Sequence, residues 1–346
     1  MSSVRPGLEL GGRYRLVELL DEGGMSVIWR GQALDNGEPV AVKMLHDALL
    51  GDDPSLAQRF DREARALFAL RHPNLLRVFD SGVEHGKPYL VMELLTGRPL
   101  DVMLEDGAPP PEVALDLFRQ IADGLAFAHR QGVLHRDLKS QNVYIVSDLA
   151  GGYRAKLLDF GLAKFTDRDK WGPESTLTVA GTVFGTPAYM SPEQATGAPM
   201  DARSDVYSLG AMLFELLTGV WPFMEEDRAR MLRAHLTEPV PKVTDVRPEL
   251  WVSDALQVLI EQAMAKAPDR RPPDAGAFLD AFEALPQPAA ALAGAQPGGV
   301  HRSEGTAAGA TPGSAGSSGG GRLALLLAIA VGVLLLGGGA AFLLAG

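Results

Sequence analysis

The chain has 346 residues, no cysteine and a formal net charge of -11 at pH 7. A chain of this length can bury enough apolar surface for one large domain without covalent cross-links, and the lack of cysteine excludes disulfides, cysteine-ligated zinc and thiol catalysis. Because nucleic-acid-binding proteins concentrate cations against phosphates, the acidic balance argues for protein or small-molecule partners and against nucleic acid.

The first 95 residues predict a short extension followed by a lobe built mainly of strands. Residues 1–12 lack the charged and then apolar pattern of a signal peptide, so we interpret them as an N-terminal extension. Residues 40–42 and 89–92 are apolar runs typical of strands. Between them one helical period is visible at Leu56, Phe60, Leu67 and Leu70. We therefore expect residues 13–95 to form a mostly β lobe with one helix.

From residue 96 to residue 285 the apolar residues recur mainly at helical spacing. The pattern is clear in two stretches, at Val113, Leu117, Ile121 and Leu125 and at Val206, Leu209, Leu213 and Leu217. This period predicts a second, mostly helical lobe. The fold class that follows is α+β, with two lobes.

The C-terminal 61 residues differ from the rest in composition. Residues 286–321 are rich in Ala, Gly, Pro and Ser and predict a flexible linker, because they cannot bury enough apolar surface to offset the entropy of ordering. Residues 322–346 are uncharged after Arg322 and long enough to span a bilayer as a helix. A buried core helix is the alternative, but a core helix is rarely uncharged all round and isolated behind a linker.

This interpretation predicts a single-pass protein of the cell membrane, anchored at its C-terminus and in contact with the lipid bilayer. Arg322 favours a cytoplasmic near side, so the two-lobed domain is expected in the cytoplasm, with no domain on the far side. Ala328 and Gly332 are small residues four apart within the span, which permits close helix pairing and a homodimer.

Three motifs in the two-lobed region carry the chemistry. Residues 40–43 read Val-Ala-Val-Lys, residues 135–142 read His-Arg-Asp-Leu-Lys-Ser-Gln-Asn, and Asp-Phe-Gly begins 17 residues after Asn142. Phosphoryl transfer needs groups that hold a triphosphate, a metal that neutralises it and a carboxylate that orients the attacking hydroxyl. In order and spacing these motifs resemble the eukaryotic-like protein kinases, and the resemblance covers about residues 13–285.

The resemblance implies a bilobal protein kinase fold and a set of catalytic residues. Lys43 is expected to hold the α- and β-phosphates of ATP, and Glu63, on the helix of the first lobe, to orient Lys43. Asp137 would accept or orient the proton of the substrate hydroxyl, with the charge of Lys139 near the transferred phosphoryl group. His135 is expected to be a packed core residue and neither an acid nor a base.

The resemblance also implies a metal site and ATP as the second substrate. Asn142 and Asp159 carry the oxygen ligands that suit Mg²⁺, with Mn²⁺ as a substitute. The adenine would lie at the hinge after residues 89–92, at Met92, Glu93 and Leu95, and between Ile28, Ala41 and Tyr144. Tyr144 is bulky for that position, so a plain core tyrosine is the alternative.

One motif departs from the family pattern. The phosphate loop of the family is G-x-G-x-x-G-x-V, whereas residues 21–28 read Asp-Glu-Gly-Gly-Met-Ser-Val-Ile. Gly23, Gly24 and Ser26 are the residues expected to approach the phosphates, since glycine lets the backbone come close. Asp21 replaces the first glycine and brings a carboxylate near a polyanion. Two readings remain open, that Asp21 opposes ATP binding or that it faces solvent.

The segment after the Asp-Phe-Gly motif resembles the bacterial serine/threonine branch. Residues 185–193 read Gly-Thr-Pro-Ala-Tyr-Met-Ser-Pro-Glu, and Lys139 also matches that branch. By resemblance Glu193 should pair with Arg271, Asp205 should brace the catalytic loop, and Thr186 should be structural. A phosphate on the activation loop could bridge Arg136 and Lys164. The candidate phosphorylation sites are Thr178 and Thr182.

The resemblance therefore predicts a membrane-associated serine/threonine protein kinase that phosphorylates proteins, including its own activation loop. A pseudokinase that binds nucleotide or partners without turnover is the main alternative, and the unusual phosphate loop is its support. A scaffold whose kinase-like domain serves mainly in docking is another. The sequence contains no recognisable sensor domain and does not identify the substrates or the activating signal.

Overall fold

The computed structural model describes residues 4–23, 26–46, 64, 67–147, 152–160, 187–225 and 227–286. All of them lie within one unit, Met1–Pro297. Several predicted features lie outside the described residues. They are Gly24, Glu63, Lys164, Thr178, Thr182, Thr186, nearly all of the linker and the whole span of residues 322–346.

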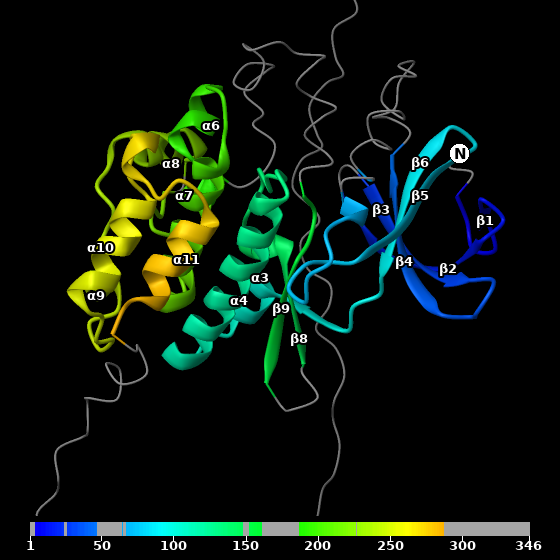
Figure 1. The fold of residues 1–346 in the computed structure, drawn as a ribbon, viewed down its shortest axis with the longest axis horizontal. Coiled ribbons are helices and arrows are strands. Elements are labelled where there is room, and N and C mark those ends of the chain that lie inside the picture. The colour runs from blue at the N-terminus through cyan, green and yellow to red at the C-terminus, as the bar shows by residue number, and fades with distance from the viewer. Residues whose placement is uncertain are drawn as a thin grey trace, which may run out of the picture. The chain divides into compact units, whose positions relative to one another are not determined.

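The N-terminal lobe is a six-stranded antiparallel sheet (Figure 1), with the order β1-β2-β3-β4-β6-β5. The strands are β1 (Glu9–Leu10), β2 (Tyr14–Glu22), β3 (Ser26–Ala33), β4 (Pro39–Leu45), β5 (Val78–Glu84) and β6 (Lys87–Glu93). The predicted runs 40–42 and 89–92 fall within β4 and β6, two neighbouring strands in the interior of the sheet. Of the helix predicted between them, the structure describes Ala64 and residues 67–70. Ala64, Leu67 and Phe68 are helical, whereas Ala69 lies in a turn and Leu70, the last residue of the predicted period, lies outside the helix.

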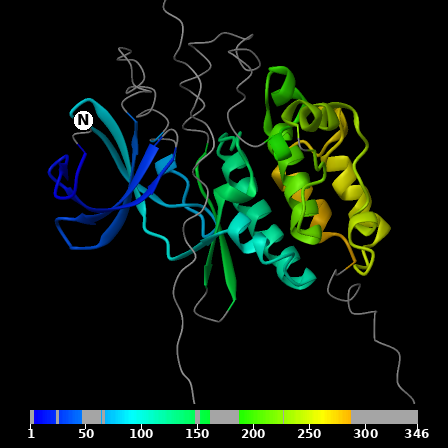
Figure 2. The same ribbon diagram turned by 180° about the vertical axis from the view of Figure 1, so that it is seen from behind.

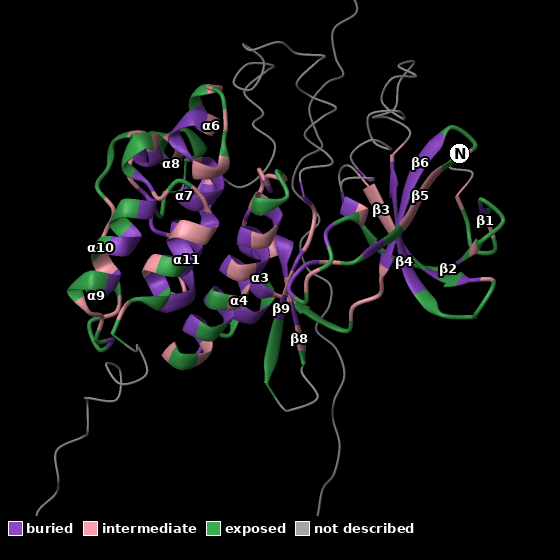
Figure 3. Cartoon of the chain, in the orientation of Figure 1, coloured by how far each residue is buried: buried purple, intermediate pink, exposed green. Residues whose placement is uncertain are grey.

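The core of the N-terminal lobe comes from apolar side chains on one face of the strands. Its members are Leu10, Leu16, Trp29, Val40, Val42, Met44, Tyr89 and Val91. β4 is buried from Val40 to Leu45, whereas most of β2 is exposed (Figure 3). The β2–β3 hairpin therefore lies at the surface, and the strand that carries Lys43 lies in the interior.

The C-terminal lobe is mainly helical, with one small antiparallel sheet of order β7-β8-β9. Its strands are β7 (Gly97–Pro99), β8 (Val143–Ser147) and β9 (Tyr153–Leu157). Its longer helices are α4 (Pro111–Arg130), α7 (Ala202–Thr218), α8 (Arg228–Thr237), α10 (Asp254–Ala263) and α11 (Ala275–Glu283). The short helical elements are α3 (Leu100–Glu105), η1 (Ser140–Asn142), η2 (Pro187–Tyr189), α6 (Pro192–Thr196), α9 (Val243–Val246) and η3 (Pro268–Arg270).

Helix α7 is the centre of the C-terminal lobe, because its apolar residues are buried on every side. It starts at the capping residue Asp201, whose side chain accepts from Arg203 N, and ends at Gly219 in the left-handed conformation (φ 80°). Gly210 lets α10 approach closely, since a Cβ there would come within 2.8 Å of Ala263 Cβ. Helix α4 lies between β9 and the pair α7 and α11 (Figures 1 and 2).

This arrangement confirms the predicted α+β fold with a sheet lobe followed by a helical lobe. The predicted change from strand-like to helical spacing of the apolar residues is confirmed, because the strand runs occur in β4 and β6 and the helical runs occur in α4 and α7. In the part of the chain that the structure describes, no helix combines the length and the apolar character required to cross a bilayer.

Candidate active site

The loop that precedes η1 is anchored to helix α7 through Asp205. The carboxylate accepts hydrogen bonds from His135 N (2.7 Å) and from Arg136 N (2.7 Å). Arg136 has a positive φ of 63°, a conformation that a non-glycine residue keeps only when its surroundings impose it. Burial favours the neutral form of Asp205, but the hydrogen bond from His129 and the nearby backbone donors outweigh it, so the pKa of Asp205 is lowered. Asp205 thus meets the loop that it was expected to brace.

His129 completes this anchor, and sequence reasoning missed it. Its Nδ1 accepts a hydrogen bond from Ala275 N (3.1 Å), so the proton of the neutral ring lies on Nε2, which donates to Asp205 Oδ2 (3.0 Å). One imidazole therefore connects α4, α7 and the start of α11. The helical period placed His129 on a buried helix, but it could not show which carboxylate lay across from it.

Asp137 lies beside two of the residues predicted to act with it. Lys139 Nζ donates to Asp137 Oδ2 at 2.8 Å, and Asn142 Nδ2 donates to the Asp137 carbonyl at 2.7 Å and to its Oδ2 at 3.2 Å. Because η1 turns the chain back after Lys139, three side chains of one short segment converge. A carboxylate flanked by an ammonium and an amide can orient a hydroxyl and stabilise the charge that develops on it.

The metal-site candidates Asn142 and Asp159 are brought together by the β8–β9 pair. Val143 pairs with Leu157, and Leu158 N donates to the Asn142 carbonyl at 2.8 Å, which sets Asp159 next to Asn142. Asp159 has a positive φ of 48°. Mg²⁺ binds to one or two protein oxygen ligands together with phosphates and water, and an amide with a carboxylate fits that mode. Among the described residues there is no cluster of three or more His, Cys, Asp or Glu side chains that would form a larger cage.

Lys43 connects the N-terminal lobe to this group. Its Nζ lies 2.5 Å from Asp159 Oδ1, and the lysine side chain is 10% exposed, whereas the aspartate side chain is 40% exposed. A largely buried ammonium requires an anion, and Asp159 provides one. The strand β4 therefore supplies a cation next to the residues predicted to hold the metal.

His135 is packed in the core, as expected, and is fully buried. Its Nε2 lies 2.8 Å from the Leu158 carbonyl, and its ring lies 4.7 Å from the ring of Phe160. Burial lowers its pKa, which keeps the ring neutral. It holds β9 against the catalytic loop.

The residues expected around adenine lie on neighbouring strands. Ala41 and Met92 are directly opposed on β4 and β6 and both are 5% exposed, and Ile28 is opposed to Lys43 on β3 and β4. Tyr144, on β8, donates its phenol proton to the Gly97 carbonyl at 2.9 Å. That bond gives Tyr144 a structural partner of its own and keeps the plain structural reading open.

Glu93, the first hinge residue, has a partner that the sequence did not suggest. Lys156 Nζ donates to Glu93 Oε1 at 2.7 Å, and Arg77 N donates to the same oxygen at 2.8 Å. The backbone N of Glu93 donates to the Arg77 carbonyl at 2.9 Å. The side chain and the backbone of the hinge are therefore both fixed, with Lys156 contributed by β9 of the C-terminal lobe.

The described part of the phosphate loop forms a hairpin turn. Asp21 pairs with Ile28 and Glu22 with Val27, and Gly23 N donates to the Ser26 carbonyl at 2.9 Å. The side chain of Asp21 is exposed and its Oδ1 accepts from Glu22 N at 2.9 Å. These contacts account for the local shape of the strand end.

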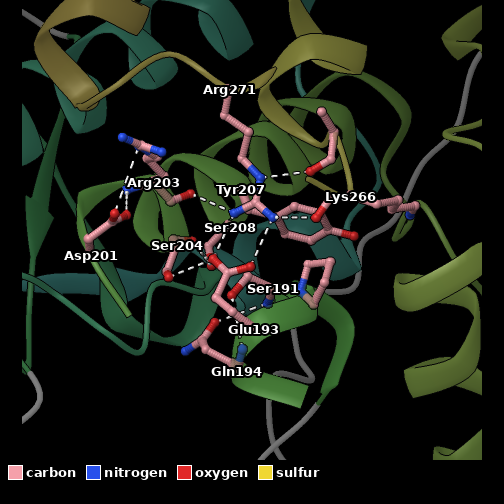
Figure 4. A network of polar contacts seen from close by, with 12 residues as sticks. Ser191, Glu193, Gln194, Asp201, Arg203, Ser204, Tyr207, Ser208, Lys266 and Arg271 are labelled. Carbon is pink, nitrogen blue, oxygen red and sulfur yellow. Dashed lines mark hydrogen bonds and ion pairs between the residues drawn. The ribbon is translucent and has the colours of Figure 1, made fainter. Parts of the chain in front are cut away.

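The pairing expected between Glu193 and Arg271 is present (Figure 4). Arg271 Nη1 lies 2.7 Å from Glu193 Oε1, and Arg271 Nη2 lies 2.9 Å from Oε2. Ser204 also donates to Glu193 Oε1, at 2.6 Å. The remaining guanidinium donors bind carbonyl oxygens of Arg203, Ala265 and Lys266. The polar groups are satisfied inside the lobe, which such a buried pair requires.

A second buried network, which sequence reasoning missed, connects η1 to η2. Tyr189 OH donates to Glu215 Oε2 at 2.6 Å and lies 2.7 Å from Ser140 Oγ, and Trp221 Nε1 donates to the same phenol at 3.1 Å. Burial raises the pKa of Glu215 to about 7. The sequence around Glu215, a glutamate in a helix rich in apolar residues, does not indicate which residues it contacts.

Comparison with known proteins places these contacts in context. The family described as Protein kinase domain matches residues 14–282. The serine/threonine-protein kinase pkn3 of Myxococcus xanthus is 40% identical over 281 residues, which cover 81% of this chain and 51% of that protein. The serine/threonine-protein kinase PknB of Mycobacterium leprae is 38% identical over 268 residues, or 76% of this chain and 41% of that protein. The chain therefore spans about half or less of the length of these curated relatives.

A solved structure of a kinase domain is also similar to this chain. The crystal structure of the Mycobacterium tuberculosis PknI kinase domain, a C20A_R136A double mutant, is similar with a TM-score of 0.63 and 28% sequence identity. The match covers 82% of this chain and 98% of that domain.

Proposed function

Because the chain belongs to the protein kinase family, as the match over residues 14–282 shows, we propose that it transfers the γ-phosphate of ATP to serine and threonine hydroxyls of proteins. One observation carries the proposal. Lys43 of the N-terminal lobe and Asp159 of the C-terminal lobe are in contact, and Asp137, Lys139 and Asn142 lie on the same short segment that borders Asp159.

The proposed mechanism assigns one task to each of these side chains. Asp137 accepts a hydrogen bond from the substrate hydroxyl and takes its proton as the new P–O bond forms and the bond from the γ-phosphorus to the bridging oxygen of ATP breaks, which releases ADP. Lys139 neutralises charge on the transferred group, in keeping with its 2.8 Å contact with Asp137. Lys43 exchanges Asp159 for oxygens of the α- and β-phosphates. Bound Mg²⁺, or Mn²⁺, would neutralise the phosphates, with Asn142 and Asp159 as its protein ligands.

The nucleotide would lie between the hinge and the β2–β3 hairpin. The backbone at Glu93 and Leu95 offers hydrogen-bonding groups to adenine. The adenine ring would contact the neighbouring side chains of Ile28, Ala41, Met92 and Tyr144. Gly23, Gly24 and Ser26 would cover the phosphates. The support is the resemblance together with the adjacent placement of Ala41, Met92 and Ile28 in the sheet.

We also propose that the kinase phosphorylates its own activation loop. Thr178 and Thr182 are the candidate acceptors, and Arg136 and Lys164 the cations that would bind the new phosphate. Phosphopeptide mapping by mass spectrometry of the self-labelled protein tests this. Phosphate found only at other residues would reject these two threonines.

Residues 322–346 support a proposal of membrane attachment, with the catalytic domain on the cytoplasmic side. The stretch is apolar and long enough to span a bilayer, and small residues in it would permit a homodimer. Extraction of membranes from cells that express the full chain tests this. A protein held by a spanning helix stays in the pellet through a carbonate wash, whereas a protein released by carbonate is not anchored in that way.

The test of the main proposal is a transfer assay with the full chain, γ-labelled ATP, Mg²⁺ and a generic protein substrate. Label on serine or threonine that disappears in Asp137→Asn supports the kinase. The rival function is a nucleotide-binding module without turnover, and the loss of two of the three phosphate-loop glycines favours it. Binding of ATP with no transfer by the wild-type chain would establish that rival.

A further inference from the structure

The side chain of His46 contacts the turn of the phosphate loop. His46 follows the last residue of β4, and its Nε2 lies 2.7 Å from the carbonyl oxygen of Gly23. A carbonyl oxygen can only accept, so Nε2 carries the proton and donates it. The contact joins residues 23 positions apart. It is a short, charge-independent link, because the neutral and the protonated ring can both donate from Nε2.

This hydrogen bond completes the fixation of Gly23. The N–H of Gly23 donates to the Ser26 carbonyl at 2.9 Å, which closes the hairpin turn, and its C=O accepts from His46. Both backbone polar groups of this glycine are therefore engaged, one within the hairpin and one by a side chain from another strand. Because backbone polar groups are strong hydrogen-bonding groups, engaging both of them restrains the backbone at Gly23.

The fixation matters because the loop keeps only one of the three glycines of the family pattern and because one of its two strands, β2, is mostly exposed. Asp21 and Ser26 stand where the family pattern has its first and third glycines, and most of β2 is exposed. The hairpin therefore has few buried side chains to hold it. An additional tie from β4, the most buried strand next to it, compensates for that.

The tie also relates the loop to the phosphate-binding lysine. His46 lies three residues after Lys43, directly beyond the end of β4, and β3 lies between β4 and β2 with Ile28 opposed to Lys43. The hydrogen bond from His46 therefore fixes the position of Gly23 relative to the strand that carries Lys43. A bound triphosphate would contact both, so their separation determines how well it fits.

We propose that His46 is a positioning residue for the nucleotide, which holds the carbonyl of Gly23 and so keeps the phosphate loop in register with Lys43. The inference rests on the proposed function, because it assumes that the nucleotide lies under the β2–β3 hairpin. His46 itself touches neither substrate. Its removal should weaken the binding of ATP and leave the chemistry of transfer unchanged.

The experiment compares His46→Phe with His46→Gln in the full chain. Phenylalanine keeps a ring and removes the donor, whereas the glutamine amide can place an N–H near the position of Nε2. After the competing hydrogen bonds to water are subtracted, one hydrogen bond changes a binding affinity by a factor of about two to ten. We expect His46→Phe to raise the KM for ATP and the Kd for Mg-ADP by about that factor at unchanged kcat, the signature of binding lost equally in ground state and transition state. His46→Gln should stay within about twofold of wild type.

A matched control is His85→Asn, which removes a second histidine of the same lobe, an exposed one at the β5–β6 turn where the side chain contacts Glu84. Asparagine tolerates the positive φ of 49° at that position. The control should leave KM and Kd unchanged. Affinity is measured by titration, so a loss of folded protein alters the stoichiometry of binding and not the Kd.

Two results would overturn the proposal for His46 while leaving the kinase proposal intact. One is transfer by His46→Phe with the wild-type KM for ATP and the wild-type Kd for Mg-ADP. The other is a glutamine variant as weak as the phenylalanine variant, which would mean that the ring matters and the donor does not. Absence of transfer by the wild-type chain refutes the kinase proposal instead, and the Kd for Mg-ADP then still decides the role of His46. A wild-type chain that binds no nucleotide refutes both.

Discussion

Glu193 and Arg271 lie 78 residues apart in the chain and meet in a bidentate ion pair inside the C-terminal lobe, at 2.7 Å and 2.9 Å. Arg271 also stacks over the ring of Tyr207, with its Cζ 4.9 Å from the ring centroid. Burial favours protonated Glu193, but the hydrogen bonds from Arg271 and Ser204 outweigh it, so the pKa of Glu193 is lowered. The pair connects α6, which follows the segment of the phosphorylation candidates, to the loop between η3 and α11.

Arg271→Ala should lower the free energy of unfolding by about 3–5 kcal/mol, because it leaves the buried Glu193 carboxylate without its cation and several carbonyl groups without donors. Arg271→Lys should recover only part of this, since an ammonium cannot reproduce the planar bidentate fork. Urea unfolding of the full chain at pH 7 measures both. The double variant Glu193→Ala, Arg271→Ala should cost clearly less than the two single variants added together. Additive costs would mean that the pair is not coupled.

The contact between Lys43 and Asp159 predicts how nucleotide binding depends on magnesium. Asp159→Asn should abolish transfer, because the metal loses its carboxylate ligand. It should also free Lys43 for phosphate, so the Kd for ATP without Mg²⁺ should fall several-fold, in line with a part-exposed ion pair worth about 0.5–1 kcal/mol. Binding measured with EDTA and with Mg²⁺ separates the two effects.

Asp137→Asn is the matched control for that experiment. It should abolish transfer equally, yet keep the wild-type strengthening of ATP binding by Mg²⁺, because Asp137 is assigned to the hydroxyl and not to the metal. Thermal unfolding of both variants should stay within a few degrees of wild type, since neither change alters packing. An Asp159→Asn protein that still binds ATP more tightly with Mg²⁺ would contradict the metal assignment.

Glu215 predicts a pH dependence of stability. Its folded-state pKa is raised by burial from 4.5 to about 7, so its contribution to stability is fully present below pH 4.5 and is lost as the pH rises through about 7. The wild-type chain should therefore lose about 2–3 kcal/mol of unfolding free energy between pH 5 and pH 8 relative to Glu215→Gln, which stays neutral. Urea unfolding at several pH values measures the difference.

A second buried group acts with the opposite sign. Burial lowers the pKa of His235 from 6.5 to about 3, so its contribution is present above pH 6.5 and is lost as the pH falls toward 3. His235 is common to the wild type and to Glu215→Gln, so it cancels in their difference. A difference that stays constant from pH 5 to pH 8 would show that Glu215 is ionised throughout, contrary to the prediction.

Local patterns were enough to predict the elements that carry motifs. The strands of Lys43 and Met92 and the helix of Asp205 follow from the period of the apolar residues. The pairing of Glu193 with Arg271, 78 positions apart, was predicted from the resemblance to the kinase family and not from a local pattern. The partners of these residues were not predictable in the same way. His129, Lys156 and Glu215 bind partners that lie 76, 63 and 26 positions away in sequence, at points that only the packing of α4, β9 and α7 brings together.

The exposed position of Asp21 revises the expected effect of its charge. At about 8 Å from a phosphate and an effective dielectric of about 20, the carboxylate would be repelled by about 2 kcal/mol. An exposed carboxylate lies in a dielectric closer to that of water, where the same repulsion is about 0.5 kcal/mol. Asp21→Gly should thus lower the KM for ATP only about twofold at low salt, with kcat unchanged.

Asp21→Asn separates charge from backbone in that prediction. Asparagine removes the charge and keeps the Cβ and an oxygen that can accept from Glu22 N, as Asp21 Oδ1 does at 2.9 Å. If repulsion is the cause, both variants lower KM alike at about 50 mM salt, and the advantage disappears at about 0.5 M, where screening is complete within a few ångströms. If only the glycine variant lowers KM, and does so at both salt concentrations, the Cβ of residue 21 and not its charge weakens the binding of ATP. A KM raised in both variants would mean that the carboxylate, through its bond to Glu22 N, shapes the end of β2 for nucleotide binding.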